Sequence, residues 1–143
     1  MITVQQILEH KGHQVWTIDA DASVLDAIGE MATHDIGALV VMEGADVVGL
    51  ISERQYARGV ALLGRSSRDT RVRDIMRTDI PRVALGTDSD ACIALITEYR
   101  TRHLPVMTDR ELVGLISIGD LVAAIIREQQ ITIDDLTRYI ATG

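Results

Sequence analysis

Hydrophobic and polar residues follow one another along this chain in an order that occurs twice. Each occurrence starts with apolar residues at helical spacing, continues with two short apolar runs around a polar turn, and ends with a second helical pattern. The paired runs, typical of strands joined in a hairpin, lie at residues 38–42 and 47–51 and at residues 104–107 and 112–116. A short extended segment, at 15–18 or at 80–85, precedes each occurrence. The order predicts two β-α-β-β-α units.

A helix is predicted on each side of each hairpin. Before the hairpins, apolar residues recur at helical spacing at Val24, Ala27, Ile28 and Met31 and again at Ala91, Ile93, Leu95 and Ile96. The candidate N-caps of these helices are Ser23 in the first half and Asp88 or Ser89 in the second. After the hairpins, helices are predicted over residues 53–63 and 118–129.

The two halves are copies of one sequence. A shift of 65 residues places Val48–Ser52 on Val113–Ser117, which gives five identities in a row. Eight of the 14 positions from 39 to 52 are identical at this offset, where ordinary residue frequencies give about one. At an offset of 68, residues 4–8 correspond to residues 72–76, so a short amphipathic segment leads into each half. The chain therefore arose by duplication.

The duplication predicts the domain organisation. We assign residues 1–63 to the first unit with an N-terminal lead-in helix, 64–79 to a linker and the second lead-in helix, and 80–130 to the second unit. A unit of about 45 residues is too small to bury both faces of its sheet. The two units should therefore pack with pseudo-twofold symmetry into one α+β module. Residues 131–143 form an amphipathic tail whose apolar stripe requires a partner surface, such as another subunit.

Composition excludes several classes of protein. The 143 residues include 14 Lys and Arg and 21 Asp and Glu, so the net charge is 14 − 21 = −7, which opposes binding to nucleic acid. The densest basic stretch, residues 65–77, also contains acidic residues and is interpreted as a solvated linker. No apolar run is long enough to span a membrane, and residues 1–6 do not resemble a signal peptide. We expect a cytoplasmic protein with neither a nucleic-acid nor a membrane partner.

No pattern of catalytic or metal-binding residues is present. The chain lacks the phosphate-binding loop, the zinc protease motif and the nucleophile elbow, so no catalytic residue and no catalytic cofactor is predicted. His10 and His13 are three residues apart, but Lys11 and Gly12 between them favour a solvated turn over a metal site. The single cysteine, Cys92, falls on the apolar face of a predicted helix and is expected to be a small buried residue.

Two strand-to-helix junctions resemble those of a known family. Gly-Leu-Ile-Ser ends the second strand of both hairpins, the sequence His103-Leu104-Pro105-Val106 opens the second hairpin, and Ser117-Ile118-Gly119-Asp120 closes it. Together with the duplication and the lead-in at 72–76, these motifs resemble a tandem pair of CBS domains over residues 3–127. The resemblance implies a non-catalytic regulatory module that binds AMP, ADP, ATP, NAD or S-adenosylmethionine between its halves. Such a module would sense energy or redox state.

The junction at Ser117 and Asp120 has the chemistry that this ligand requires. Ser117 starts a predicted helix, where free backbone N–H groups favour a phosphate. The Asp120 carboxylate, one turn later, can accept hydrogen bonds from both ribose hydroxyls. The alternative is an ordinary helix cap with an acidic first turn. In the first half Gln55 aligns with Asp120, and an amide is a weaker acceptor, so the site at Ser52 and Gln55 is empty, weaker or adapted to another ligand.

The resemblance implies the remaining ligand contacts. In the site on the first unit, Arg102 and His103, ahead of Leu104 and Pro105, would face the phosphates. In the site on the second unit, Arg54 would have that role. The adenine would contact the first extended segment of each unit, which is Thr17, Ile18 and Asp19 in one and Arg82, Val83 and Ala84 in the other. The alternative for these segments is a plain edge strand.

The partners follow from the same resemblance. Members of the family usually form homodimers through exposed helices. No effector domain is expected in these residues, so the signal would pass to an effector protein, whose identity the sequence does not give, or would rest on the dimer itself. The alternative function is a dimeric scaffold or interaction domain whose clefts stay empty.

Overall fold

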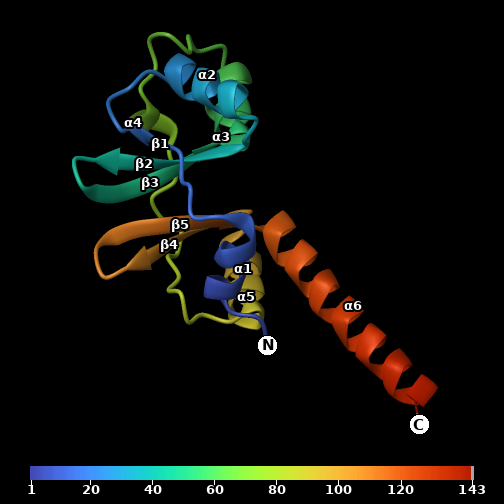
Figure 1. The fold of residues 1–143 in the computed structure, drawn as a ribbon. Helices are drawn as coiled ribbons and strands as arrows, with labels where there is room; N and C mark the ends of the chain where they lie inside the picture. The colour runs from blue at the N-terminus through green and yellow to red at the C-terminus, as the bar shows by residue number, and fades with distance from the viewer. Residues whose placement is uncertain (143) are drawn as a thin grey trace.

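The computed structural model describes residues 1–142 and confirms two hairpin-containing units in an α+β arrangement (Figure 1). In chain order the elements are α1 (Val4–Lys11), β1 (Thr17–Asp19), α2 (Val24–His34), β2 (Ala38–Glu43), β3 (Asp46–Ser52), α3 (Glu53–Tyr56), a π-helical turn (Ala57–Ala61), α4 (Val72–Ile75), α5 (Ser89–Tyr99), β4 (His103–Thr108), β5 (Glu111–Ser117) and α6 (Ile118–Thr142). Ser23 caps α2, and Asp88 rather than Ser89 caps α5 by accepting from the Ala91 amide at 2.8 Å.

The two sheets are related but unequal. In the first unit β1 runs parallel to β2, which pairs antiparallel with β3. In the second unit β4 and β5 form the same hairpin, but of the expected extended segment 80–85 only Val83 pairs with β4, opposite Val106. The pairing ends at Val83 because the chain turns at the next residue, where the Thr87 amide donates to the carbonyl of Ala84 at 3.1 Å. The two hairpins stack on each other (Figure 1) and share an apolar cluster that includes Val40, Leu50, Met107 and Leu115.

Each lead-in helix packs on the other unit, and not on the unit that follows it in the chain. Residues 1–63 were expected to form one unit, yet Leu8 of α1 is fully buried in the same apolar cluster as Leu104 and Ile116 of the second unit. Conversely, Val72 of α4 is buried in the cluster of the first unit, and its amide donates to the carbonyl of Ala22 at 2.9 Å. The lead-in helices are therefore exchanged between the units.

Two equivalent glycines explain the exchange. Gly49 in β3 and Gly114 in β5 are 65 residues apart, and each lies where the other lead-in segment crosses the strand. A Cβ on Gly49 would lie 2.7 Å from the carbonyl oxygen of Arg77, which also accepts from the Leu50 amide. A Cβ on Gly114 would lie 2.7 Å from the Leu8 side chain. A glycine within a strand thus permits close approach of another segment.

Substitution of these glycines should have unequal effects. We expect Gly49→Ala to lower the free energy of unfolding by about 1–3 kcal/mol because the new methyl group meets backbone. Gly114→Ala should cost less, since a flexible side chain can move aside. Gly29→Ala in α2, where nothing lies within 4 Å of the added carbon, should stabilise by about 0.5–1 kcal/mol. Urea unfolding of the three variants checks the order, and equal effects at Gly49 and Gly29 would contradict it.

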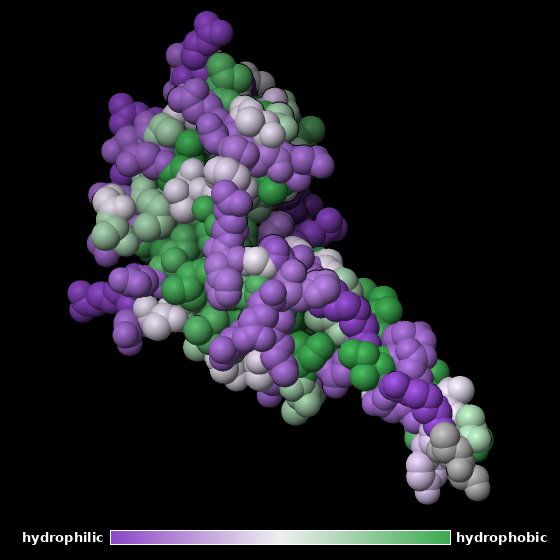
Figure 2. Space-filling model, viewed as in Figure 1, coloured by the Kyte–Doolittle hydropathy of each residue, from purple (hydrophilic) through white to green (hydrophobic). Residues whose placement is uncertain are grey.

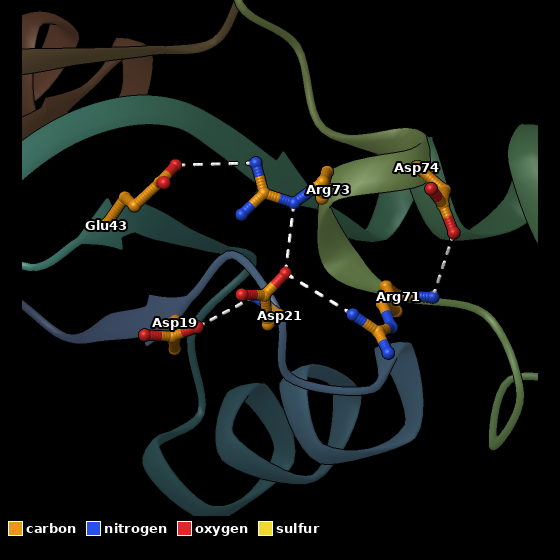
Figure 3. Close-up of polar contacts among 6 residues, drawn as sticks. All are labelled: Asp19, Asp21, Glu43, Arg71, Arg73 and Asp74. Carbon is orange, nitrogen blue, oxygen red and sulfur yellow. Dashed lines mark hydrogen bonds and ion pairs between the residues drawn. The ribbon is translucent and has the colours of Figure 1, made fainter.

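An ion-pair cluster fixes the second lead-in helix to the first unit (Figure 3). Arg73 donates to Asp21 at 3.0 Å and to Glu43 at 3.3 Å, and Arg71 lies 3.6 Å from Asp21. Hydrogen bonding to Arg73 holds the pKa of Asp21 below its usual value. Part of the basic stretch interpreted as a solvated linker is therefore anchored, although its charged groups stay exposed to water.

The predicted tail is not a separate element. Residues 131–142 continue α6, a single helix of 25 residues that extends away from the two units (Figure 1), and Gly143 lies outside the described residues. The helix continues because no proline or glycine interrupts residues 120–142. By contrast, the helix predicted over 53–63 is regular only to Tyr56 and then widens into the π-helical turn.

Candidate ligand-binding clefts

Two clefts lie where the units meet, one at each strand-to-helix junction. Each hairpin begins beside the residue on which it ends: Ala38 pairs with Ser52, and His103 pairs with Ser117. The first cleft, which we call the arginine cleft, has a volume of about 490 Å³ and is lined by Gly37, Leu50, Ser52, Glu53, Arg54, Gln55, Arg58, Arg77, Arg100, Thr101, Arg102 and His103. The second, the aspartate cleft, has about 360 Å³ and is lined by Lys11, Gln14, Val15, Trp16, Ile36, Gly37, Ala38, His103, Leu115, Ser117 and Asp120.

The arginine cleft concentrates positive charge in a protein whose net charge is −7. Five arginines line it, against a single acidic residue, Glu53. Arg77 is held in place, since it donates to Asp79 at 3.0 Å and to the carbonyl of Tyr99 at 2.7 Å. The others come from both units, with Arg54 on the first and Arg102 on the second. A site of this composition favours an anion with several oxygens, because guanidinium groups donate in pairs to such groups.

The junction of the first unit is closed by its own side chains. The Gln55 carbonyl oxygen accepts from the Ser52 amide at 3.0 Å and from the Ser52 hydroxyl. Ser52 and Gln55 do line one cleft with Arg102 and His103, as their grouping in the sequence predicted. Leu104 and Pro105, the residues that follow, are buried under the cleft and do not line it.

The junction of the second unit holds a partly buried carboxylate. Asp120 accepts from the Ser117 amide at 2.8 Å and from the Lys11 ammonium at 2.6 Å, and the Ser117 hydroxyl accepts from the Asp120 amide at 3.1 Å. Burial alone would raise the pKa of Asp120, but the hydrogen bonds from Lys11 and Ser117 outweigh it and hold the pKa below its usual value. Asp120 is therefore ionised at neutral pH, with one of its acceptor positions taken by Lys11.

Lys11 and Trp16 are cleft residues that sequence reasoning missed. Lys11 ends α1, and it reaches Asp120 because α1 packs on the second unit. Trp16 lies just before β1, with one face of its ring stacked on His34 at a centroid distance of 3.5 Å. The only aromatic ring of the aspartate cleft besides that of His103 is Trp16, among the residues that the structure describes. The exchange of the lead-in helices was the missing information for Lys11, and the register of β1 on β2 was the missing information for Trp16.

His103 lines both clefts and so forms part of the wall between them. Burial, reinforced by the nearby positive charge of Lys11, lowers the pKa of His103 to about 4. The imidazole is consequently neutral at pH 7. A neutral ring can accept a hydrogen bond from a ligand or donate one to it, depending on its tautomer.

Protonation of His103 should make stability depend on pH. Its pKa is lower in the folded than in the unfolded chain, so between about pH 6.5 and pH 4 the unfolded chain binds the proton first. Stability is therefore lost as pH falls, by roughly 2 kcal/mol between pH 7 and pH 4.5. Urea unfolding of His103→Gln should lack this part of the loss, and NMR titration of the imidazole gives the pKa directly. A pKa of 6 or more would contradict the burial argument.

The other predicted contacts do not line the clefts for which they were predicted. Thr17, Ile18 and Asp19 line a hollow beside α2, and Arg82, Val83 and Ala84 line one beside the hairpin turns. Arg54 lines the arginine cleft and not, as expected, the cleft of Asp120. Thr17, Ile18 and Asp19 were predicted for the cleft of Ser52 and Gln55. Thr17 instead pairs with Val40, two residues along β2 from Ala38, so residues 14–16 lie at that end of the sheet and line the aspartate cleft.

Comparison with known proteins identifies the fold. A family model described as CBS domain matches residues 4–61 and 72–127. The chain belongs to the CBS domain family. It is 34% identical to the mitochondrial CBS domain-containing protein CBSX3 of Arabidopsis thaliana, over 99% of this chain and 73% of that protein.

Solved CBS structures match the whole two-unit arrangement. A protein from Burkholderia ambifaria, described as a candidate signal-transduction protein with CBS domains, is 46% identical, with a TM-score of 0.85 over 90% of this chain and 96% of that one. A CBS-domain protein from Agrobacterium tumefaciens is 35% identical, with a TM-score of 0.81 over 86% and 98%. The inosine-5'-monophosphate dehydrogenase of Methanocaldococcus jannaschii is 26% identical, and the match covers 76% of this chain but only 21% of that enzyme.

Residues 1–142 contain neither a membrane-spanning helix nor a metal-binding cluster. None of the helices there is both long and apolar enough to cross a bilayer. Within the same residues, no group of three or more histidine, cysteine or acidic side chains is arranged to hold a metal ion.

Proposed function

We propose that this CBS pair is a non-catalytic regulatory module that binds an adenosine-containing ligand, AMP, ADP, ATP or NAD, in the clefts between its units. S-adenosylmethionine shares the adenosine and belongs to the same class. The observation that carries the proposal is the arginine cleft, in which five guanidinium groups from both units surround one open volume of about 490 Å³. Four of these arginines are exposed and form no ion pair within the part of the chain that the structure describes: Arg54, Arg58, Arg100 and Arg102. An anion bound among them would therefore offset their mutual repulsion without a large cost of desolvation.

The two clefts offer different parts of a nucleotide site. The arginine cleft supplies cations for a phosphate chain, with Gln55 in place of an acidic ribose acceptor. The aspartate cleft supplies the Asp120 carboxylate for the ribose hydroxyls and the Trp16 ring beside it. A ligand there must first displace Lys11 from Asp120, which lowers the affinity by the free energy of that ion pair. We therefore expect the arginine cleft to bind first and to prefer ligands with more phosphates.

Ligand binding can produce a signal because both clefts include residues from the two units. A ligand in the arginine cleft would join Arg54 on the first unit to Arg102 on the second. Any change in their relative position would depend on a difference in ligand affinity between two arrangements. The signal would then pass to an effector protein or through a homodimer, and a chain with this output would report the energy or redox state of the cell. The Burkholderia relative is likewise described in terms of signal transduction.

A thermal-shift panel tests the proposal. At one hundred times its dissociation constant, a ligand that binds only the folded chain adds about 2.7 kcal/mol of stability, which corresponds to a rise of about 5–10 °C in melting temperature. AMP, ADP, ATP, NAD and S-adenosylmethionine are compared with inorganic triphosphate and with GTP. A rise with adenosine compounds beyond that with triphosphate supports nucleoside recognition, and equal rises reduce the site to an anion site.

A dimeric scaffold with empty clefts is the second candidate. It is favoured by the Lys11–Asp120 pair at 2.6 Å, which already satisfies the carboxylate that a ribose would need. Absence of any thermal shift, including in Lys11→Met, where Asp120 is left without its cation, would establish the scaffold over the sensor.

A further inference from the structure

Helix α6 leaves the body of the protein before it ends. Its N-terminal part is packed, with Leu121 and Ala124 fully buried against α1, α5 and β5. Every residue from Glu128 to Ala141 is exposed, and this part of the helix extends away from the two units (Figure 1). An isolated helix of that length is marginal in water, because helix formation draws most of its stability from an apolar face that is packed. We call residues 122–141 the arm.

The arm carries a regular apolar seam. Val122, Ile126, Ile133, Leu136 and Ile140 follow one another at alternating steps of four and three residues once Gln129 is included. With Ile126 taken as heptad position a, isoleucine occupies every a position, while Val122, Gln129 and Leu136 occupy the d positions. All five apolar side chains are at least half exposed, and hydrophobic residues recur along the arm in Figure 2. This spacing fits a partner helix and not a flat surface.

The charges of the arm indicate that the partner helix is an identical one. No charged side chain flanks the seam, since the e and g positions on either side of it hold Ala123, Gln130, Thr137, Ile125, Thr132 and Tyr139. The charged residues of the arm all fall at the outer positions b, c and f. Two chains of net charge −7 repel each other in general, but two seams of this kind meet without like charges opposite each other.

We propose that the arm is an interface with a second copy of this chain, in which the two seams form a short parallel two-stranded coiled coil. Isoleucine at the three a positions, with Leu136 at the d position between the last two of them, is the combination that favours two parallel strands. Gln129 is the one polar residue in the seam, and paired with its counterpart it would fix the register of the two helices. The coiled coil places the two CBS pairs side by side at one end of the arms, whether or not ligand is bound.

Matched substitutions separate the seam from the rest of the arm. Ile133→Glu puts a charge at the centre of the seam, whereas Ile131→Glu puts the same charge on the outer face, at position f. Light scattering over a concentration series should show a dimer for the natural chain and for Ile131→Glu, and a dissociation constant raised at least about a hundredfold for Ile133→Glu. Hydrogen exchange of the β2, β3, β4 and β5 amides should not change in either variant, which shows that the two units stay folded.

Cross-linking tests the parallel orientation in the full chain. Cys92, the only native cysteine, is fully buried, so a cysteine introduced in the arm is the one thiol available for oxidation. Ile140→Cys, at the far end of the seam, should form an interchain disulfide, and Ile131→Cys should not. A natural chain that is monomeric, a dimer that Ile133→Glu leaves intact, a trimer, or equal cross-linking at the two positions would each overturn the proposal.

Discussion

Replacing Leu8 by alanine is expected to lower the free energy of unfolding by about 2–5 kcal/mol and to loosen the second unit more than the first. Leu8 belongs by sequence to the segment that leads into the first unit, yet it is fully buried with Leu104, Ile116 and Leu121. Its side chain also covers Gly114, where the strand has no side chain of its own. Truncation therefore opens a cavity in the core of the second unit.

Hydrogen exchange locates the effect of Leu8→Ala. Amides of β4, β5 and α5 should exchange faster, while those of β2, β3 and α2 should change little. Met76→Ala is the matched variant, because Met76 covers Gly49 in the first unit and corresponds to Leu8 in the duplication. Its effect should fall on the first unit. Leu62→Ala, at a residue that is 79% exposed, serves as the neutral control. Faster exchange in the first unit of Leu8→Ala would contradict the exchanged arrangement.

Replacing Arg102 by alanine is expected to weaken ATP binding by about 10–100-fold, the range for loss of a hydrogen bond between charged groups. Arg102 lines the arginine cleft from the second unit, and it faces the strand-to-helix junction of the first. The loss should be smaller for AMP, since fewer phosphate oxygens need a cation, and smaller again at high salt. Isothermal titration with AMP and ATP at two salt concentrations measures both differences.

The control for Arg102→Ala is Arg110→Ala. Arg110 is an exposed arginine in the turn between β4 and β5, and it lines two hollows away from the arginine cleft. This variant makes the same change in net charge, so it accounts for long-range electrostatics. Equal losses in the two variants would show that general charge, and not the cleft, governs the affinity.

The hairpins and the duplication were predictable because strand pairing within a unit is local and leaves a periodic pattern. The partner of each lead-in helix was not, because the apolar stripe of α1 identifies the face that is buried but not the core that receives it. Gly49 and Gly114 were a usable signal, since a glycine inside an apolar strand indicates close approach of another segment.

The residues of the clefts were likewise predictable where local strand pairing brings them together, and not where a lead-in helix or the strand register does. Ser52 and Gln55 were correctly grouped with Arg102 and His103, which are adjacent to strand ends whose pairing is fixed by the hairpins. Lys11 was missed because its position depends on the exchanged helix. The adenine contact of the first unit was predicted at residues 17–19, but residues 14–16, just before β1, are the ones that line a cleft, the aspartate cleft. Only the observed register of β1 on β2 shows this.

We propose that nucleotide binds between the units at the arginine cleft. Amide chemical shifts recorded by NMR during titration with ATP test it most directly, since they locate the ligand without substitution. We expect saturable shifts at residues 52–55 and 100–103, which line that cleft from the two units. Shifts confined to Thr17–Thr33, around the hollow beside α2, or no saturable shifts with any adenosine compound, would contradict it.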